Sequence, residues 1–241
     1  MRAILTFHSI DSSGSVMSIP AEDLRCLIHA IRAGGHTIVD LHSLLTEPSE
    51  QDRIAVTFDD GLRSVHREAL PILREENVPA TLLLTTGHVG ADSRWASLPA
   101  DGPVFPMLTW AEIEDLQAAG WDIQAHTVSH PHLSRLAEGE IETEFVASND
   151  TIASRLGRTP SVLAYPYGTV DYRTAEIAAR HYEFCLTTQM ALLPETILRP
   201  QHVPRLDVYY FRSPHIHRHF GALSFRAYLA LRGVLRKLRG Q

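Results

Sequence analysis

The stretch Ile54-Ala55-Val56-Thr57-Phe58-Asp59-Asp60-Gly61 decides the fold class and the place of the functional site. Its first five residues form a short apolar run that indicates a strand, and the run ends in two carboxylates and a glycine. Adjacent carboxylates repel each other and are costly unless a cation or a functional role compensates for them. Asp-Asp-Gly by itself is more often a surface turn, because Asp and Gly are turn formers. The stretch therefore predicts a strand that ends either in a surface turn or in a functional site.

Similar apolar runs alternate with helical patterns along the chain. The expected strands are Ala3–Phe7, Thr37–Val39, Ile54–Phe58, Ala80–Thr85, Trp121–Ala125, Ser161–Tyr165 and Glu183–Thr187. The expected helices are Ala21–Ala33, Arg63–Glu76, Ala111–Ala119, Glu138–Leu156 and Tyr172–His181. Thr109 and Glu112 have the spacing of a capping box, and Gly120 and Gly157 follow the ends of two helical patterns. The alternation favours an α/β fold, a distorted (β/α) barrel of about seven parallel strands, with one catalytic domain over residues 1–210.

Composition narrows the class of protein. The 241 residues are 44% hydrophobic and 21% charged, as in an ordinary folded protein, and the net charge of -6 argues against nucleic acid as a partner. Cys26 and Cys185 are far apart, which excludes a disulfide framework and a cysteine zinc site. The sequence has no apolar run of about 18 residues and no signal-peptide pattern at its start. We expect a cytoplasmic protein, and nothing in the sequence indicates its oligomeric state.

Two other expected strands also end in polar residues. Trp121–Ala125 leads into His126-Thr127-Val128-Ser129-His130, whose two imidazoles can reach one ion if the loop turns like a helix. Thr127 stands where the H-E-x-x-H protease pattern requires Glu. Ser161–Tyr165 leads into Pro166-Tyr167-Gly168, a tight turn with a backbone N–H that can face the same mouth. Each segment alone could be a turn or a surface loop. Together, and in this order along the chain, they indicate a metal hydrolase.

These segments resemble the ordered motifs of the polysaccharide deacetylases, carbohydrate esterase family 4. The resemblance rests on residues 57–61, 126–130 and 164–168 and extends over about residues 3–207. It implies a distorted (β/α) barrel and metal-dependent hydrolysis of N-acetyl or related acyl groups on sugars or glycans. Zinc is the expected ion, with cobalt, nickel, manganese and iron as alternatives.

The resemblance also implies roles for the matching residues. Asp59 corresponds to the general base, and the backbone N–H of Tyr167 corresponds to the oxyanion donor. The implied metal ligands are Asp60, His126 and His130. Such a three-ligand site leaves open positions for water and substrate, as a catalytic site requires. The expected substrate-binding residues are Trp95, Tyr165 and Pro166.

Two parts of the family pattern are absent from their usual places. The family's Arg that orients the base is replaced by Ala164, and Arg205 is our candidate substitute. The late Asp-x-x-Asp-Trp and Leu-x-His motifs are missing, but Ile4–Asp11 looks like the latter moved to the amino end, as in circularly permuted family members. We therefore expect His8 to be the general acid. The alternative is that His8 is a hydrogen-bonded histidine near a strand end.

Two other functions remain open on the sequence alone. One is a related amidase or deformylase that acts on a small non-sugar amide, since it would share the barrel and the metal. The other is a catalytically silent carbohydrate-binding domain. The paired carboxylates and the complete set of implied metal ligands argue against a silent domain, which has no need of them.

The C-terminal segment, residues 211–241, differs in charge from the rest of the chain. After Asp207 there is no Asp or Glu, whereas seven Lys and Arg residues occur. A helical projection of residues 222–239 separates the basic residues from an apolar side made of Leu223, Ala227, Tyr228, Leu231, Val234, Leu235 and Leu238. Such a helix either packs on the barrel or lies on an anionic membrane surface, where a lipid-linked glycan would be the substrate.

Overall fold

The main sheet is a curled sheet of parallel strands. The computed structural model describes residues 1–48, 51–96 and 102–238. The strands follow the order β10-β1-β5-β6-β7-β8-β9, and β4 pairs with β5 beside them. Their bounds are β1 Arg2–Phe7, β4 Thr37–Ile38, β5 Arg53–Phe58, β6 Thr81–Leu84, β7 Asp122–Ala125, β8 Val162–Ala164, β9 Phe184–Leu186 and β10 Leu206–Asp207. The predicted distorted barrel of about seven parallel strands is therefore confirmed.

A short segment, residues 203–207, joins the two edges of this sheet. Val203 forms a parallel bridge with Leu186 of β9, and β10, which follows it, pairs in parallel with β1. The backbone N–H of Thr187 donates to the Val203 carbonyl at 2.8 Å. The two edges are thus linked by residues 203–207, which include the two-residue strand β10 that the sequence analysis did not predict. A separate two-stranded sheet is formed by β2 (Ser9–Ile10) and β3 (Ser18–Ile19).

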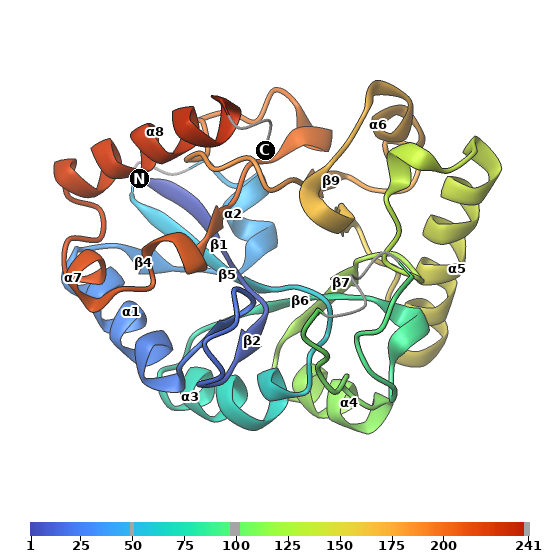
Figure 1. Ribbon diagram of the computed structural model, residues 1–241, viewed down its shortest axis with the longest axis horizontal. Coiled ribbons are helices and arrows are strands. Elements are labelled where there is room, and N and C mark those ends of the chain that lie inside the picture. The colour runs from blue at the N-terminus through green and yellow to red at the C-terminus, as the bar shows by residue number, and fades with distance from the viewer. Residues whose placement is uncertain (49–50, 97–101, 239–241) are drawn as a thin grey trace.

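Helices surround the strands, as Figure 1 shows. They are α1 Ala21–Ala33, α2 Leu41–Thr46, α3 Leu70–Glu75, α4 Trp110–Ala118, α5 Glu138–Leu156, α6 Tyr172–Ala178, α7 Pro214–His217 and α8 Leu223–Leu238. The capping box of α4 is confirmed, because Thr109 Oγ1 accepts from the Glu112 N–H at 3.3 Å and Glu112 accepts from the Thr109 N–H at 2.9 Å. The predicted helix over 63–76 is a π-helical turn, Val65–Ala69, followed by α3. Helix α2 was not predicted.

The hydrophobic core has a part outside the barrel and a part inside it. Successive side chains of β5 point alternately into these two parts. Ile54, Val56 and Phe58 belong to the large cluster that the strands share with α1, α3, α4 and α5. Ala55 belongs to a smaller cluster with residues from other strands and from α2. Side chains in a strand point alternately to opposite faces, so the phase of Ala55 continues to Asp59, just past the strand. The sequence of β5 thereby directs Asp59 toward the inside of the barrel.

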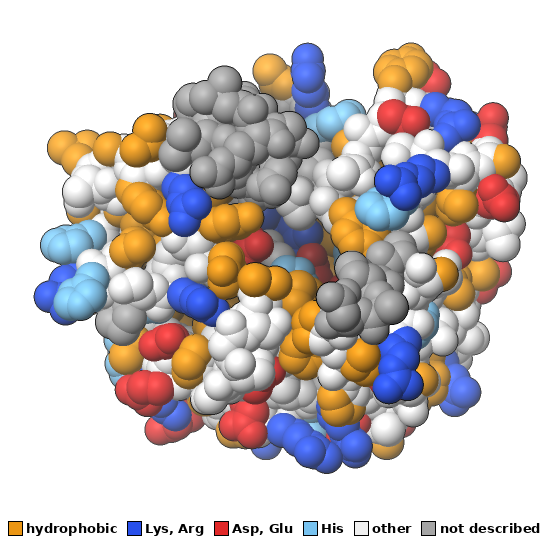
Figure 2. All heavy atoms as spheres, viewed as in Figure 1, with side chains coloured by type: hydrophobic (Ala, Val, Ile, Leu, Met, Phe, Trp, Pro, Cys, Tyr) orange, Lys and Arg blue, Asp and Glu red, His pale blue; other side chains and the backbone are white. Residues whose placement is uncertain are grey.

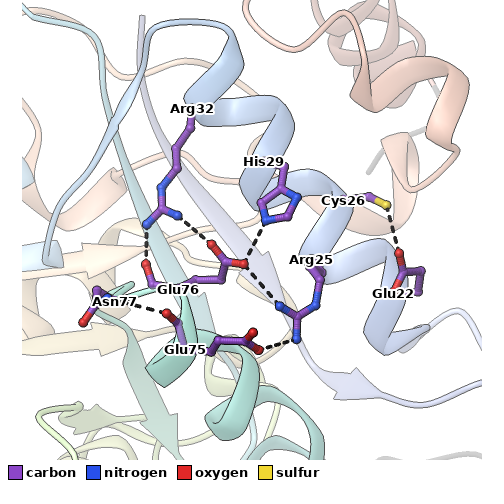
Figure 3. Close-up of polar contacts among 8 residues, drawn as sticks. All are labelled: Glu22, Arg25, Cys26, His29, Arg32, Glu75, Glu76 and Asn77. Carbon is purple, nitrogen blue, oxygen red and sulfur yellow. Dashed lines mark hydrogen bonds and ion pairs between the residues drawn. The ribbon is translucent and has the colours of Figure 1, made fainter.

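An ion-pair network joins α1 to the end of α3 on the outside of the barrel (Figure 3). The Glu76 carboxylate lies 3.2 Å from Arg25, 2.8 Å from His29 and 2.7 Å from Arg32. Arg25 also reaches Glu75 at 2.7 Å. The network thus links α1, which lies between β3 and β4 in the chain, to α3, which lies between β5 and β6.

The C-terminal helix α8 packs on the barrel through a different side from the predicted one. Phe225 and Leu229 are buried and belong to the same cluster as the barrel strands, with Phe211 in edge contact with Phe225. Leu223 and Leu231, which the helical projection placed on the apolar side, are 85% and 61% exposed. The alternative in which this apolar side packs on the barrel is therefore wrong for Leu223 and Leu231, because Phe225 and Leu229 make the contact instead.

Other parts of the predicted basic and apolar sides lie outside what the structure describes. The side chains of residues 234–238 and all of Arg239 are in this group. No helix in the described ranges is long and apolar enough to cross a membrane.

Candidate active site

The ends of three strands bring predicted residues to one mouth of the barrel. His8 follows β1, Asp59 and Asp60 follow β5, and His126 follows β7. A cavity of about 240 Å³ opens there, and the residues lining it include His8, Asp59, Asp60, His126, His130 and Tyr167. Figure 2 shows a hollow in the middle of one face, with acidic, basic and His side chains in its depth. The structure thus gathers residues that are up to 159 positions apart into one site.

Asp60, His126 and His130 form a compact group of possible metal ligands. Asp60 Oδ1 lies 3.4 Å from His126 Nε2 and 3.5 Å from His130 Nε2. One ligand atom from each residue lies within 4.8 Å of the other two, and all three side chains are buried. Asp60 has φ of 72° and His130 φ of 54°, the left-handed region that non-glycine residues rarely adopt. Strain of this kind concentrates at functional sites.

The donor set fits a divalent cation. His126 Nδ1 donates to the Ala164 carbonyl at 2.7 Å, so its Nε2 is left with a lone pair directed at Asp60. Asp60 Oδ2 is buried and has no hydrogen-bond partner among the described residues. A buried carboxylate oxygen without a partner is costly, and a cation removes that cost. One carboxylate and two imidazoles are ligands that zinc and related ions bind.

Electrostatics favour the metal-binding protonation states of His130 and Asp60, whereas His126 holds a proton more readily than usual. Burial lowers the pKa of His130 to about 3, so the ring is neutral at physiological pH. Burial alone would raise the pKa of Asp60, but the hydrogen bond with His126 and the nearby His130 outweigh it and lower that pKa. Burial opposes a charge on His126, whereas Asp60 raises the His126 pKa above its ordinary value. A cation between them would take the place of that proton.

Asp59 forms a bidentate ion pair with Arg205. Nη1 and Nη2 of Arg205 each lie 2.7 Å from one Asp59 carboxylate oxygen, and Arg205 Nε donates to the Thr187 carbonyl at 3.1 Å. Arg205 is 1% exposed and Asp59 3% exposed. Burial would raise the pKa of Asp59, but Arg205 and then His126 lower it below its usual value. The arginine predicted to replace the one missing at Ala164 therefore lies against the predicted base.

Tyr167 lies in a strained turn at the rim of the metal-ligand group. Its φ of 62° and ψ of 0° lie in the left-handed region. The Gly168 N–H closes the turn by donating to the Tyr165 carbonyl at 2.8 Å. The Tyr167 ring lies 4.7 Å from the His130 ring and stacks on His132 at 4.1 Å. These ring contacts fix the turn beside the proposed metal ligands.

The predicted substrate contacts divide into two groups. Trp95 and Tyr165 line the cavity, and the Trp95 ring lies 4.3 Å from that of His130. Pro166 is buried within the turn and is not among the residues lining the cavity. Proline at this position restricts the backbone that precedes Tyr167.

Several cavity residues carried no signal in the sequence. Val16 and Met17, in the turn before β3, and Leu62 and Phe105 add an apolar wall to the cavity. These residues lie outside the motifs and are apolar, so there was no reason to select them from the sequence. Apolar walls around a few convergent polar groups are typical of small-molecule sites.

Comparison with known proteins defines the class that this barrel and site represent. The sequence model of the polysaccharide deacetylase family matches residues 46–182. The chain belongs to the polysaccharide deacetylase family, carbohydrate esterase family 4. The predicted family resemblance is therefore confirmed.

Curated relatives are longer than this chain. The chain is 24% identical over 193 residues to YxkH of Bacillus subtilis (strain 168), which covers 77% of this chain and 64% of that protein. It is 26% identical over 125 residues to the poly-beta-1,6-N-acetyl-D-glucosamine N-deacetylase of Staphylococcus aureus (strain MRSA252), covering 48% of this chain and 40% of that enzyme. The chain thus spans less than two thirds of the length of these relatives.

Solved structures share the fold over most of their length. The Streptococcus pyogenes deacetylase PplD in complex with acetate has a TM-score of 0.75 and 21% identity, covering 89% of this chain and 95% of that one. IcaB from Ammonifex degensii has a TM-score of 0.71 and 21% identity, covering 90% and 96%. At this identity the likeness establishes the fold alone.

Proposed function

We propose that the protein is a metal-dependent hydrolase that removes an N-acetyl or similar acyl group from an amino sugar in a glycan. The observation that carries the proposal is the buried group of Asp60, His126 and His130 beside the ion pair of Asp59 with Arg205. A hydrolase of an amide needs an activated water, a stabilised oxyanion and a proton for the leaving amine. The residues around the cavity can supply each of these.

Asp60, His126 and His130 would hold the cation and Asp59 would act as general base. A divalent ion, zinc in our proposal, supplies polarisation of the acyl carbonyl and a lower pKa for water when it is bound. The lowered pKa of Asp59 keeps it ionised and able to accept a proton from water. Arg205 occupies one lone pair on each Asp59 oxygen and orients the carboxylate, and a second lone pair on each oxygen remains available.

The Tyr167 N–H and His8 complete the proposed chemistry. The turn at Tyr167 would direct its backbone N–H at the oxyanion that develops on the acyl group. His8, which lines the same cavity at the end of β1, would give a proton to the departing amine. His8 follows β1, which pairs with β5, the strand that leads into the proposed base.

The proposed substrate is an N-acetylated glycan. The apolar wall of Met17, Leu62 and Phe105 suits an acyl methyl group, and Trp95 suits a sugar ring. The name of the Staphylococcus aureus relative, an N-acetyl-D-glucosamine polymer deacetylase, supports the same class of substrate.

The deciding experiment measures bound metal and acetate release together. Purified protein treated with a chelator should lose hydrolysis of N-acetylglucosamine oligomers and regain it with Zn²⁺. His126→Ala and His130→Ala should each lose bound metal and turnover in parallel. A panel of small non-sugar amides serves as the competing substrate class. Full activity in the chelator-treated protein would overturn the metal mechanism, and hydrolysis of the amides alone would overturn the glycan assignment.

We also propose that α8 contacts an anionic membrane surface at the inner face of the cytoplasmic membrane. The outward side of the helix exposes Leu223 and Leu231, and Arg226 lies on the same helix with 43% of its side chain exposed. Each basic residue near an anionic surface contributes about 1 kcal/mol, and exposed apolar side chains add burial in the headgroup region. A lipid-linked glycan would then be the substrate.

Sedimentation with vesicles tests this contact. The protein should sediment at low salt with vesicles that contain phosphatidylglycerol and remain in solution with phosphatidylcholine alone. The double variant Leu223→Ser/Leu231→Ser should lose sedimentation and retain hydrolysis of a soluble oligomer, because both side chains point away from the core. Failure of the unaltered protein to sediment with the anionic vesicles would refute the contact.

A further inference from the structure

The loop that carries His130 has an improbable backbone conformation. Thr127 has φ of 69° and His130 φ of 54°, and neither residue is a glycine. The left-handed region is unfavourable for both, so the isolated loop would not adopt this shape. Contacts from outside the loop must therefore hold it in place.

One side of the loop is held by the segment after β6. The Thr86 N–H donates to the Thr127 carbonyl at 3.1 Å, and the Gly87 N–H donates to the Val128 carbonyl at 2.9 Å. A Cβ atom at Gly87 would lie 2.6 Å from the Val128 oxygen, so only glycine allows this approach. These bonds account for two carbonyl groups of the loop but for none of its N–H groups.

The N–H groups on the other side converge on one carboxylate of α5. Glu144 accepts from the Val128 N–H at 2.8 Å, from the Ser129 N–H at 3.0 Å and from the Ser129 hydroxyl at 2.6 Å. Hydrogen bonds to an ionised acceptor are shorter and stronger than neutral ones. On the same helix Ser148 donates its hydroxyl to the Thr127 carbonyl at 3.3 Å. The Glu144 carboxylate thus holds the two residues that immediately precede His130.

We propose that Glu144 is a positioning residue that sets the His130 imidazole at the distance where it shares a cation with Asp60 and His126. This inference rests on the proposed metal-binding role of that group. Ser129 is one peptide unit from His130 and Val128 is two, so a displacement of either residue shifts His130. The three bonds therefore transmit the position of α5 to the His130 ring.

The chemistry requires a carboxylate at this position. A carboxylate offers two oxygens that only accept, which suits three donors from one loop. An amide in its place offers one accepting oxygen and one donating nitrogen, so it can keep part of the arrangement. Helix α5 itself is anchored by its buried residues Ile141, Phe145 and Ile152 and does not depend on Glu144.

The test measures the affinity of the protein for Zn²⁺ by competition with a chromophoric chelator. We expect Glu144→Ala to weaken Zn²⁺ binding by about 10-fold or more, as for other residues that orient metal ligands. Glu144→Gln should weaken it less. The matched control is Glu142→Gln on the same helix, whose carboxylate pairs with Arg180 and His181 and not with the loop. The control should bind Zn²⁺ as the unaltered protein does.

The outcomes separate this inference from the proposed function. Loss of Zn²⁺ affinity in His130→Ala, together with unchanged affinity in both Glu144 variants, would overturn the role of Glu144 and leave the metal site standing. Unchanged affinity in His130→Ala would overturn the metal site itself. Should Glu144→Ala fail to fold, the affinity of Glu144→Gln relative to Glu142→Gln decides, and equal values overturn the inference. At saturating Zn²⁺ we also expect Glu144→Gln to recover most of its kcat, which a general structural defect would not allow.

Discussion

Asp59 and Asp60 are neighbours in sequence but have separate partners. The left-handed φ of 72° at Asp60 turns the chain, so that Asp59 meets Arg205 while Asp60 meets His126 and His130. The charge of Asp59 is thus compensated by a guanidinium, whereas Asp60 lies against two imidazoles with which it could share a cation. The sequence could identify the carboxylates because two charges at the end of an apolar run are conspicuous. It contained no sign of Glu144, which is one charged residue among several on an ordinary helix.

Replacing Asp59 by Asn tests the division of labour between the two carboxylates. The variant removes a proton acceptor and leaves Asp60 in place, so we expect a loss of turnover on the order of 100-fold or more with bound metal unchanged. Metal content and kcat on an N-acetylated oligomer are the measurements. A variant that loses metal and activity together would show that Asp59 is a ligand and not a base.

His8→Ala tests the predicted acid. We expect kcat to fall by roughly 100-fold, because the amine would leave without a proton. The loss should be smaller for a substrate whose leaving group needs no proton, such as an aryl acetate ester. An equal rate in variant and unaltered protein on the glycan would leave His8 without a catalytic role.

Arg205→Gln changes the pH dependence of activity. Without the guanidinium, burial raises the pKa of Asp59. The base must be ionised, so the acid limb of the kcat/KM profile should move to higher pH. Leaving Asp59 buried and unpaired should also lower the free energy of unfolding by about 3–5 kcal/mol. An acid limb at the same pH as in the unaltered protein would contradict this account of Arg205.

Long helices with clear apolar periodicity could be predicted from the sequence, whereas very short helices and strands could not. Helices α1 and α5 begin and end as predicted, because apolar spacing and a following glycine fix both bounds. β10 has two residues and α2 has six, and neither is long enough to leave a periodic pattern. The docking side of α8 also could not be predicted, since it depends on the tertiary neighbours Phe211 and Phe220.

Paired substitutions in α8 test which side of the helix stabilises the fold. Phe225 is 2% exposed, so Phe225→Ala should lower the free energy of unfolding by about 3–5 kcal/mol. Leu223 is 85% exposed, and Leu223→Ala should change it by less than about 0.5 kcal/mol. Denaturant unfolding of the two variants measures both values. Equal values would mean that the helix does not pack as described.

For the whole molecule, the parallel arrangement of strands and helices could be predicted, but the way in which the barrel closes could not. Seven strand signals and five helix signals were enough to define a parallel barrel, because each alternation of strand and helix adds a parallel strand. Contacts between residues that are distant in sequence decide which edge strands meet. The segment 203–207 that makes them is recognised only once β9 and β1 are seen on either side of it.

The stability of the molecule should fall in acid. The folded-state pKa values of Asp59 and Asp60 are both lower than in an unfolded chain, where an aspartate titrates near about 4. A carboxyl group of this kind adds its full stabilisation above the unfolded pKa and loses it as the pH falls through the folded one. We therefore expect the unfolding free energy of the metal-free protein to decline below about pH 4, as measured by urea titration. Asp60→Asn should flatten this decline, and a decline of equal slope would exclude Asp60 as its source.

Arg205 lies in the segment that closes the barrel, and its ion pair with Asp59 spans 146 residues of sequence. During synthesis on the ribosome, Asp59 and the metal-ligand residues emerge long before Arg205 does. A nascent chain that ends before this segment therefore has an open barrel and a base without its guanidinium. Such long-range pairing also slows folding, because a large loop must be closed before any contact rewards it. Closure of the barrel and alignment of the base depend on the same segment, so activity should appear in a refolding protein only once the barrel has closed.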